Sequence, residues 1–266
     1  MMSKVSVGYI GLMAAVVAVA MYVLFPVVVL VFASFSASNH LTFPPESFSL
    51  RWYDAVASDP EWIDAAWVSV RLGFTSAAIA TLLGVPAAFA LIRYTIPGEA
   101  LLNALILSAL VTPPVITALA TFLFFAPLGL VNSILGLACA HAVGSLPLVV
   151  INTAASLRSA DRNLERAAII CGARPLVAVS TITLPIISPG IIIGMLFAFV
   201  HSTHELQVSM FMLGSVGKPV SVKLWSDVQS STDPKIAAAS SLLIVVAILT
   251  LAGVSLARIW AERRKT

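Results

Sequence analysis

The chain has 266 residues, of which 59% are hydrophobic and 10% are charged, and its formal net charge is +3. Soluble domains carry about 25% charged residues, and the mean hydropathy here is +1.01. A water-soluble fold of this length is excluded because it could not bury so much apolar surface, so lipid must surround most of the chain.

Six apolar runs follow one another along the chain, each of roughly the length that crosses a bilayer, about 20 residues. They lack the alternating pattern of a membrane β-barrel, and only a helix satisfies its own backbone in lipid. We therefore predict an all-α, multi-pass membrane protein with a single domain over residues 1–266. The six predicted spans are 8–34, 66–92, 100–126, 131–152, 185–205 and 236–257.

The first run follows Lys4, as in a secretory signal peptide, but it continues to about Ala33. A signal peptide has an apolar core of about 7–15 residues, so we interpret the run as an uncleaved first span. The small residues that follow it, "ASFSAS", keep cleavage open as the alternative.

Lysine and arginine in the flanks indicate orientation, because they are enriched on the cytoplasmic side. With a cytoplasmic N-terminus, ten lie inside and four lie outside, which favours both termini in the cytoplasm. The inside residues are Lys4, Arg93, Arg158, Arg162, Arg166, Arg174, Arg258, Arg263, Arg264 and Lys265, and the outside residues are Arg51, Lys218, Lys223 and Lys235.

The outer segment 35–65 mixes Trp52, Tyr53 and Trp62 with acidic residues. This composition predicts a short helix at the membrane surface, with its aromatic rings at headgroup level. A docking surface for a soluble partner is the alternative interpretation.

The third span contains Pro113 and Pro114 near its middle. A broken helix at membrane depth occurs where it is buried in protein or lines a wet cavity. Two interpretations stay open: a lining of a transport path, and a plain packing kink.

One cytoplasmic loop, about 153–184, is too long for a tight turn. Asp161 is placed to cap a short helix over "LERAAII", and Gly172 is placed to end it. A second, mostly apolar piece leads to Leu184-Pro185, where the fifth span begins. This arrangement predicts a rigid contact surface for another protein.

The same loop resembles the cytoplasmic signature of permease subunits in binding-protein-dependent ATP-binding-cassette (ABC) importers. That signature is Glu-Ala-Ala, three residues, Gly, nine residues, Ile, one residue, Leu-Pro. The chain has Ala167-Ala168, Gly172, Ile182 and Leu184-Pro185 at these spacings, with Arg166 at the usual Glu position and Glu165 beside it.

The resemblance extends over nearly the whole chain. The stretches "FPPESFSLRWYDAVASDPEWIDAAWVSVRLG" and "LGLVNSILGLACAHAVGSLPLVVINTAASLR" are similar to the polyamine (spermidine/putrescine) type of permease. The resemblance implies the type I importer permease fold, with six spans and a cytoplasmic coupling helix, in the bacterial cytoplasmic (inner) membrane. It also implies two ATP-binding subunits, a second permease and a periplasmic or extracellular solute-binding protein as partners, with membrane lipid around them.

By the same resemblance, the loop passes nucleotide-driven movement from the ATPase to the permease. The coupling residues that it implies are Arg162, Glu165, Arg166, Ala167, Ala168, Gly172, Leu184 and Pro185. We expect no cofactor, no metal and no nucleic-acid partner.

The chain has no recognisable ATPase site, since "GSVGKP" at 214–219 has the wrong spacing for a phosphate loop. We therefore expect a transport subunit rather than an enzyme. The polyamine-like stretches favour a polyamine or similar small solute. Because "HELQVSMFML" and "SVKLW" resemble ferric-iron permeases, ferric iron stays open as an alternative, with phosphonate or opine as further ones.

The stretch "HSTHE", 201–205, places His201, His204 and Glu205 at i, i+3 and i+4, on neighbouring helical positions. An intramembrane metal-dependent hydrolase is the alternative from another class, but such an enzyme needs a pattern like His-Glu-x-x-His. We predict that these residues, with Pro113 and Pro114, line the outer end of a translocation path. A plain interhelical hydrogen-bond cluster is the competing interpretation, and we expect that role for the lone His141.

Overall fold

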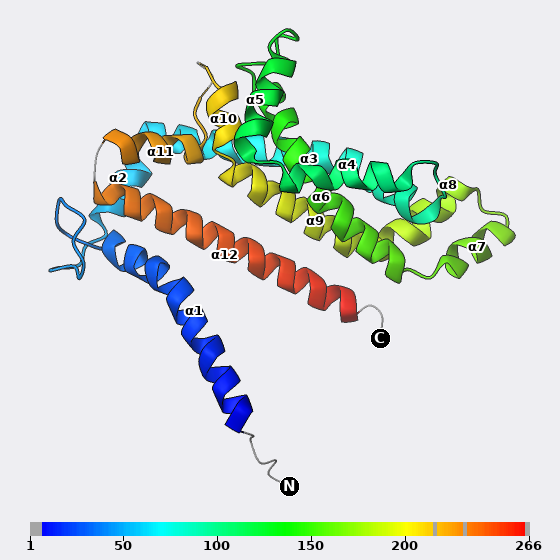
Figure 1. Cartoon of the computed structure of the whole chain (residues 1–266), viewed down its shortest axis with the longest axis horizontal. Coiled ribbons are helices and arrows are strands. Elements are labelled where there is room, and N and C mark those ends of the chain that lie inside the picture. The colour runs from blue at the N-terminus through cyan, green and yellow to red at the C-terminus, as the bar shows by residue number, and fades with distance from the viewer. Residues whose placement is uncertain (1–6, 215–216, 231–232, 264–266) are drawn as a thin grey trace. The chain divides into compact units, whose positions relative to one another are not determined.

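The computed structural model describes residues 7–214, 217–230 and 233–263. Its elements in chain order are α1 (Val7–Ser34), α2 (Arg51–Ser58), α3 (Pro60–Arg93), α4 (Glu99–Val111), α5 (Pro114–Phe125), α6 (Ile134–Ser159), α7 (Arg162–Ile170), α8 (Pro175–Ala178), the π-helix η1 (Val179–Thr183), α9 (Leu184–His204), α10 (Gln207–Met212), α11 (Val220–Ser230) and α12 (Pro234–Arg263) (Figure 1). Lys4, Arg264 and Lys265 of the charge count, and residues 215–216 of the "GSVGKP" turn, lie outside the described residues.

The all-α, multi-pass fold is confirmed, and among the described residues the only strand-like pairing is an isolated bridge, Ser36 to Phe48. Four helical stretches are long and apolar enough to cross a membrane: Gly11–Ser34, Pro60–Arg93, Ile134–Ser159 and Pro175–His204. The pair α4 and α5 forms a fifth if it is counted as one bent span. The sixth predicted range lies within α12, whose apolar part is Pro234–Thr250.

The helical stretch that contains the fifth span begins ten residues earlier than predicted, because α8, η1 and α9 run on as one helix from Pro175. In a regular α-helix the ring of Pro185 would clash with the carbonyl of residue i−4, Thr181. Thr181 lies inside η1, and the wider turn of a π-helix relieves such crowding. The proline therefore marks a local widening rather than the start of the helix.

The chain divides into two compact units, 1–63 with 224–245, and 64–223 with 246–266. In the first unit α2 confirms the short helix predicted within 35–65, and the ring of Tyr53 lies 5.2 Å from that of Phe35. Lys235 forms an ion pair with Asp59. Most side chains of α1 are exposed, as expected for a helix that lipid or a partner covers.

In the second unit α6 packs along α9, and the contact depends on two glycines of α9 (Figure 1). A Cβ on Gly190 would lie 2.0 Å from the Ser156 Oγ and 2.8 Å from the Asn152 carbonyl oxygen. A Cβ on Gly194 would lie 2.9 Å from the Val149 Cα. Small residues four apart let helix backbones approach closely in a membrane.

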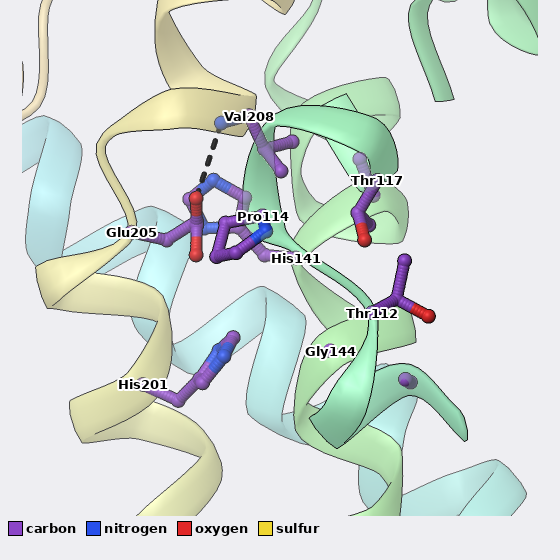
Figure 2. A pocket seen from close by; sticks show the side chains of 10 residues that line it. Thr112, Pro114, Thr117, His141, Gly144, His201, Glu205 and Val208 are labelled. Carbon is purple, nitrogen blue, oxygen red and sulfur yellow. Dashed lines mark hydrogen bonds between the residues drawn. The ribbon is translucent and has the colours of Figure 1, made fainter. Parts of the chain in front are cut away.

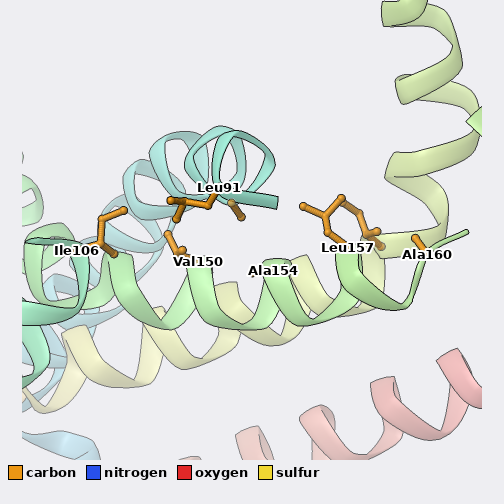
Figure 3. Close-up of a cluster of buried hydrophobic side chains, with 8 residues drawn as sticks. Leu91, Ile106, Val150, Ala154, Leu157 and Ala160 are labelled. Carbon is orange, nitrogen blue, oxygen red and sulfur yellow. The ribbon is translucent and has the colours of Figure 1, made fainter. Parts of the chain in front are cut away.

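A cluster of apolar side chains holds α3, α4 and α6 together toward the coupling end of α6 (Figure 3). Leu91 of α3 and Ile106 of α4 pack with Val150 and Leu157 of α6, and all four are buried. This packing holds the ends of α3 and α6 from which the predicted coupling loop starts.

The predicted short helix within the loop 153–184 is confirmed as α7, but the loop is shorter than predicted because α6 continues to Ser159 and the next helical stretch starts at Pro175. The Asp161 side chain accepts a hydrogen bond from the Asn163 amide at 2.9 Å and caps α7. Gly172 ends the helix with φ of +96°, a conformation that favours glycine. The chain then returns through α8, so α7 and α8 form a small hairpin at the end of α9 (Figure 1).

Candidate functional site

The third span breaks between α4 and α5, which are bent by 111°. Thr112 and Pro113 adopt extended backbone conformations, and a residue before proline is disfavoured in the helical region. The Thr112 hydroxyl and amide both donate to the Ser108 carbonyl, at 2.8 and 2.9 Å. The last amide before the break is therefore satisfied within α4, which ends at this point.

A cavity of about 40 Å³ lies at this break, where α5 approaches α6, α9 and α10 (Figure 2). It has room for a few water molecules but not for a solute with several carbon atoms. Its lining residues are Ala109, Thr112, Pro114, Thr117, Ala140, His141, Gly144, His201, Glu205 and Val208.

His141 is buried, with 1% of its surface exposed, and it joins three helices. Its Nδ1 lies 2.8 Å from the Ser202 Oγ on α9, and its Nε2 lies 3.1 Å from the Ser209 Oγ on α10. The Ser209 hydroxyl donates its hydrogen to the Glu205 carbonyl at 2.9 Å. An imidazole protonated on Nε2 alone therefore satisfies both contacts, and the predicted interhelical role of His141 is confirmed.

Glu205 is the C-cap of α9 and lies two residues before the first residue of α10. One carboxylate oxygen, Oε1, accepts hydrogen bonds from the amides of Gln207 and Val208, both at 3.1 Å. Figure 2 shows the bond from Val208. A carboxylate is favourable at the positive end of a helix, where free amides point outward. The other oxygen, Oε2, makes no hydrogen bond within the described part of the chain and is the acceptor left for a ligand.

The residues predicted for the path do not all meet at the cavity. His201, Glu205 and Pro114 line it, whereas His204 and Pro113 do not. His201 is half-buried, 3.4 Å from the Ser145 Oγ, and it packs where only a glycine fits, since a Cβ on Gly144 would lie 2.7 Å from its ring. His204 is exposed, and its Nδ1 bonds back to the Val200 carbonyl at 2.9 Å.

A second cavity, of about 250 Å³, lies between α3, α4 and α6 and was not foreseen from the sequence. It contains three polar side chains, Glu99, Asn103 and Arg158, over an apolar floor. The one available signal was the spacing of Glu99 and Asn103, which places both on one face at the start of an apolar helix.

The two cavities share a face of α6. Gly144 lines the first, and Ile151 and Arg158 line the second. These residues are seven apart, close to two helical turns, so they form one stripe about 21 Å long. The stripe leads from the small polar cavity to the larger charged one.

The predicted coupling residues lie together at the other end of α9. Glu165 accepts a hydrogen bond from the Thr183 hydroxyl at 2.9 Å, and Arg162 donates to the Arg93 carbonyl at 3.4 Å. Arg166 and Ala167 are exposed, Ala168 is half-buried, and Leu184-Pro185 begins α9.

Apolar side chains of the hairpin α7–α8 are also exposed. Ile170 and Leu176 have 85% and 83% of their surface exposed, and Leu164 and Ile169 are exposed as well. No residue of α7 is buried within this chain. An exposed apolar surface of this kind is typical of a protein contact.

No group of three metal-ligating side chains occurs among the residues that the structure describes.

Three comparisons place the chain among known proteins. The family model "Binding-protein-dependent transport system inner membrane component" matches residues 95–266. The chain is 26% identical to the spermidine/putrescine transport system permease protein PotC of Escherichia coli K12, over 90% of this chain and 89% of the relative. It is 31% identical to the putrescine permease PotI of the same strain, over 82% of this chain and 80% of the relative.

A more distant function is also represented among the relatives. The chain is 34% identical to the molybdenum transport system permease protein ModB of Mycobacterium bovis, over 75% of this chain and 81% of the relative. Among solved structures, a bacterial ABC transporter that imports alginate matches with a TM-score of 0.72 and 18% identity, over 92% of this chain and 95% of that chain. The alginate transporter in complex with its periplasmic protein matches with a TM-score of 0.65 and 16% identity, over 96% and 93% of the two chains.

Proposed function

Because the chain belongs to the family of binding-protein-dependent transport system inner membrane components, we propose that it forms half of the translocation path for a small cationic solute of the polyamine class. It is a multi-pass permease subunit of an ABC importer in the bacterial inner membrane, and ATP hydrolysis belongs to separate subunits. The observation that carries the proposal is the pair of cavities along one face of α6.

The smaller cavity is the outer gate, in a closed state. His201 and Glu205 come from the end of α9, and Pro114 comes from the break in the third span. Since the cavity admits only water, passage requires α5 or α9 to move. Pro113 sets the bend, and His204 lies on the exposed side of α9, toward the outer approach to the gate.

The larger cavity is the inner mouth of the path. Orientation by lysine and arginine puts both termini in the cytoplasm and the α7–α8 hairpin on the inner side. Glu99, Asn103 and Arg158 then lie at the cytoplasmic ends of α4 and α6.

The α7–α8 hairpin docks on an ATP-binding subunit. Its exposed apolar side chains, with Ile170 and Leu176 foremost, supply the contact surface. A second permease completes the path, two ATP-binding subunits drive it, and a solute-binding protein delivers the solute on the outer side. The single permease domain, 1–266, is part of this proposal.

The solute class rests on charge. Glu205 offers a free carboxylate oxygen at the gate, and a carboxylate attracts an ammonium group and repels an anion. The spermidine/putrescine and putrescine relatives support the same class. This charge disfavours phosphonate.

Uptake by the reconstituted transporter tests the proposal. Proteoliposomes that contain the permease pair and the ATPase, supplied with binding protein and ATP, should accumulate labelled putrescine or spermidine. Uptake of ferric iron, a phosphonate or an opine, with no uptake of either polyamine, would overturn the solute class. ATP-driven uptake of no solute by an intact complex would overturn the transport role itself.

A further inference from the structure

The coupling helix α7 contacts the membrane-spanning part of the second unit through two side-chain hydrogen bonds. Glu165 accepts from the Thr183 hydroxyl, next to the start of α9, and Arg162 donates to the backbone carbonyl of Arg93, at the end of α3. No residue of α7 is buried in this chain. These two bonds are side-chain contacts through which a displacement of α7 can act on α9 and on α3.

The two bonds differ in strength. The Thr183–Glu165 bond is 2.9 Å long, and its acceptor is a carboxylate. The Arg162–Arg93 bond is 3.4 Å long, is exposed, and its acceptor is a neutral carbonyl. Each bond has one ionised partner, so the two differ in length and exposure, and the shorter, partly buried Glu165–Thr183 bond is the stronger because shielding from water strengthens it. The attachment of α7 to α9 is therefore the firmer one.

The Thr183 hydroxyl donates its hydrogen bond to another helix, unlike the hydroxyls of its neighbours. Thr181 and Ser180 donate to the Val177 carbonyl of their own helical stretch, and both hydrogen bonds are exposed. Thr183 is 3% exposed, and its hydroxyl leaves the helix to reach α7. Helical hydroxyls commonly bond back to their own backbone, so the cross-helix bond needs a specific arrangement.

That arrangement involves the π-helix. Thr183 is the last residue of η1, which precedes α9. π-Turns inside longer helices are uncommon and frequently occur at functional sites. From Thr183, α9 runs to His201 and Glu205, a rise of about 27–33 Å, so a shift or rotation at Thr183 reaches the small cavity through a continuous helix.

We infer that the Glu165–Thr183 hydrogen bond is the link that passes movement of the coupling helix to α9 and thereby to the gate. Glu165 is a positioning residue in this inference, because it touches no solute and acts through Thr183. Its carboxylate holds η1 in register with α7, so that α7 and the start of α9 move as one body. The inference rests on the proposed function for the direction of coupling, but the link itself can be tested without any solute.

The test uses the assembled transporter with four permease variants. Thr183→Val removes the hydroxyl and keeps the shape, and Thr183→Ser keeps the hydroxyl. Glu165→Gln removes the charge. Thr181→Val is the matched control, because it removes a hydroxyl from the same π-helix that bonds only within its own helical stretch. Co-purification with the ATPase and thermal unfolding show that each complex is assembled.

Two readouts separate the link from the solute assignment. The first is solute-independent: hydrogen exchange of the peptide 200–213 in the complex, with and without ATP and vanadate. We expect Thr183→Val to abolish most of the nucleotide-dependent change, and Thr183→Ser and Thr181→Val to keep it. The second is the ratio of putrescine imported to ATP hydrolysed, which should fall about tenfold in Thr183→Val, equivalent to about 1.4 kcal/mol, and by less in Glu165→Gln, whose amide oxygen can still accept the hydroxyl.

Each outcome bears on the inference. If Thr183→Val keeps the nucleotide-dependent exchange change, or if Thr181→Val loses it equally, the link is wrong. If the wild-type complex shows the exchange change but imports no polyamine, the solute assignment fails and the exchange result for Thr183→Val still decides the link. Non-additive effects of Glu165→Gln and Thr183→Val in the double variant would support a direct bond.

Discussion

Replacing the two glycines of α9 by alanine tests the packing on which the gate depends. Gly190 and Gly194 both face α6, and at each the missing Cβ lets the backbones approach. In an open helical position, alanine is favoured over glycine by about 1 kcal/mol. The outcome therefore depends on whether the contact at these positions outweighs that gain.

The distances to the added Cβ atoms indicate how much stability each substitution should cost. At Gly194 the new Cβ would lie 2.9 Å from the Val149 Cα, a backbone atom that cannot turn away. Overpacking of this kind costs about 1–3 kcal/mol, so Gly194→Ala should destabilise by about 1 kcal/mol net of its helix propensity. At Gly190 the obstacles are the Ser156 Oγ at 2.0 Å and the Asn152 carbonyl oxygen at 2.8 Å, and we expect about 2 kcal/mol.

The chain supplies its own control. A Cβ added at Gly253 of α12 would have no atom within 4 Å, so Gly253→Ala should leave stability unchanged or raise it by up to about 1 kcal/mol. The measurement is thermal unfolding of the purified complex in detergent, where each kcal/mol shifts the midpoint by about 2–4 °C in a chain of this size.

A substitution in α6 tests whether the loss of stability comes from the contact at Gly190. Ser156→Ala removes the atom nearest to the Gly190 position, so it should recover part of the loss in Gly190→Ala and none of the loss in Gly194→Ala. The reasoning would be refuted if Gly194→Ala stabilised the complex as much as Gly253→Ala does, because the close approach of α6 would then be absent.

Three further outcomes follow from the hydrogen bonds. Asp161→Ala should cost about 1 kcal/mol of local helix stability through loss of the cap of α7, seen as faster hydrogen exchange in 162–170 with no change in α6. His141→Phe leaves the hydroxyls of Ser202 and Ser209 without their shared partner and should cost about 1–3 kcal/mol, measured by thermal unfolding; an unchanged midpoint would contradict the interhelical role. Glu205→Gln keeps an oxygen for the amides at the start of α10 but removes the charge, so polyamine uptake should fall at least tenfold while the midpoint stays within about 2 °C; equal uptake would count against a cationic solute at the gate.

Features that depend on neighbouring residues were predictable from the sequence. Composition showed that the solvent is lipid, Pro113 and Pro114 predicted the break in the third span, and Asp161 and Gly172 predicted both ends of α7. Each of these local effects acts within about one helical turn: a proline clash, a side-chain cap, or a positive φ.

The start of the fifth span was less predictable. Leu184-Pro185 suggests that the helix begins there. The helical stretch in fact starts at Pro175, because the wider turn of η1 accommodates the ring of Pro185. A π-turn depends on what the surrounding residues pack against, so the sequence of η1 by itself did not predict it.

The composition of the gate was decided by tertiary structure. The sequence places His201, His204 and Glu205 on neighbouring helical positions, but α5 and α6 approach only one side of this helix end. His204 therefore does not line the small cavity, whereas Thr112, Thr117 and Gly144 do. Cys171 follows two isoleucines in the sequence, yet it is the C-cap of α7 and is exposed.

The sequence alone thus determined that the chain is a helical membrane protein with a capped short helix between two spans, because lipid solubility, helix breaks and caps depend on local composition and spacing; the coupling role of that helix came from the family resemblance. Which hydroxyl reaches Glu165, and which hydroxyls His141 meets, depended on how the chain folds back on itself, through contacts between residues 18, 61 and 68 positions apart. Such contacts follow from how apolar faces and glycines let helices pack, and that packing exists only in the folded chain.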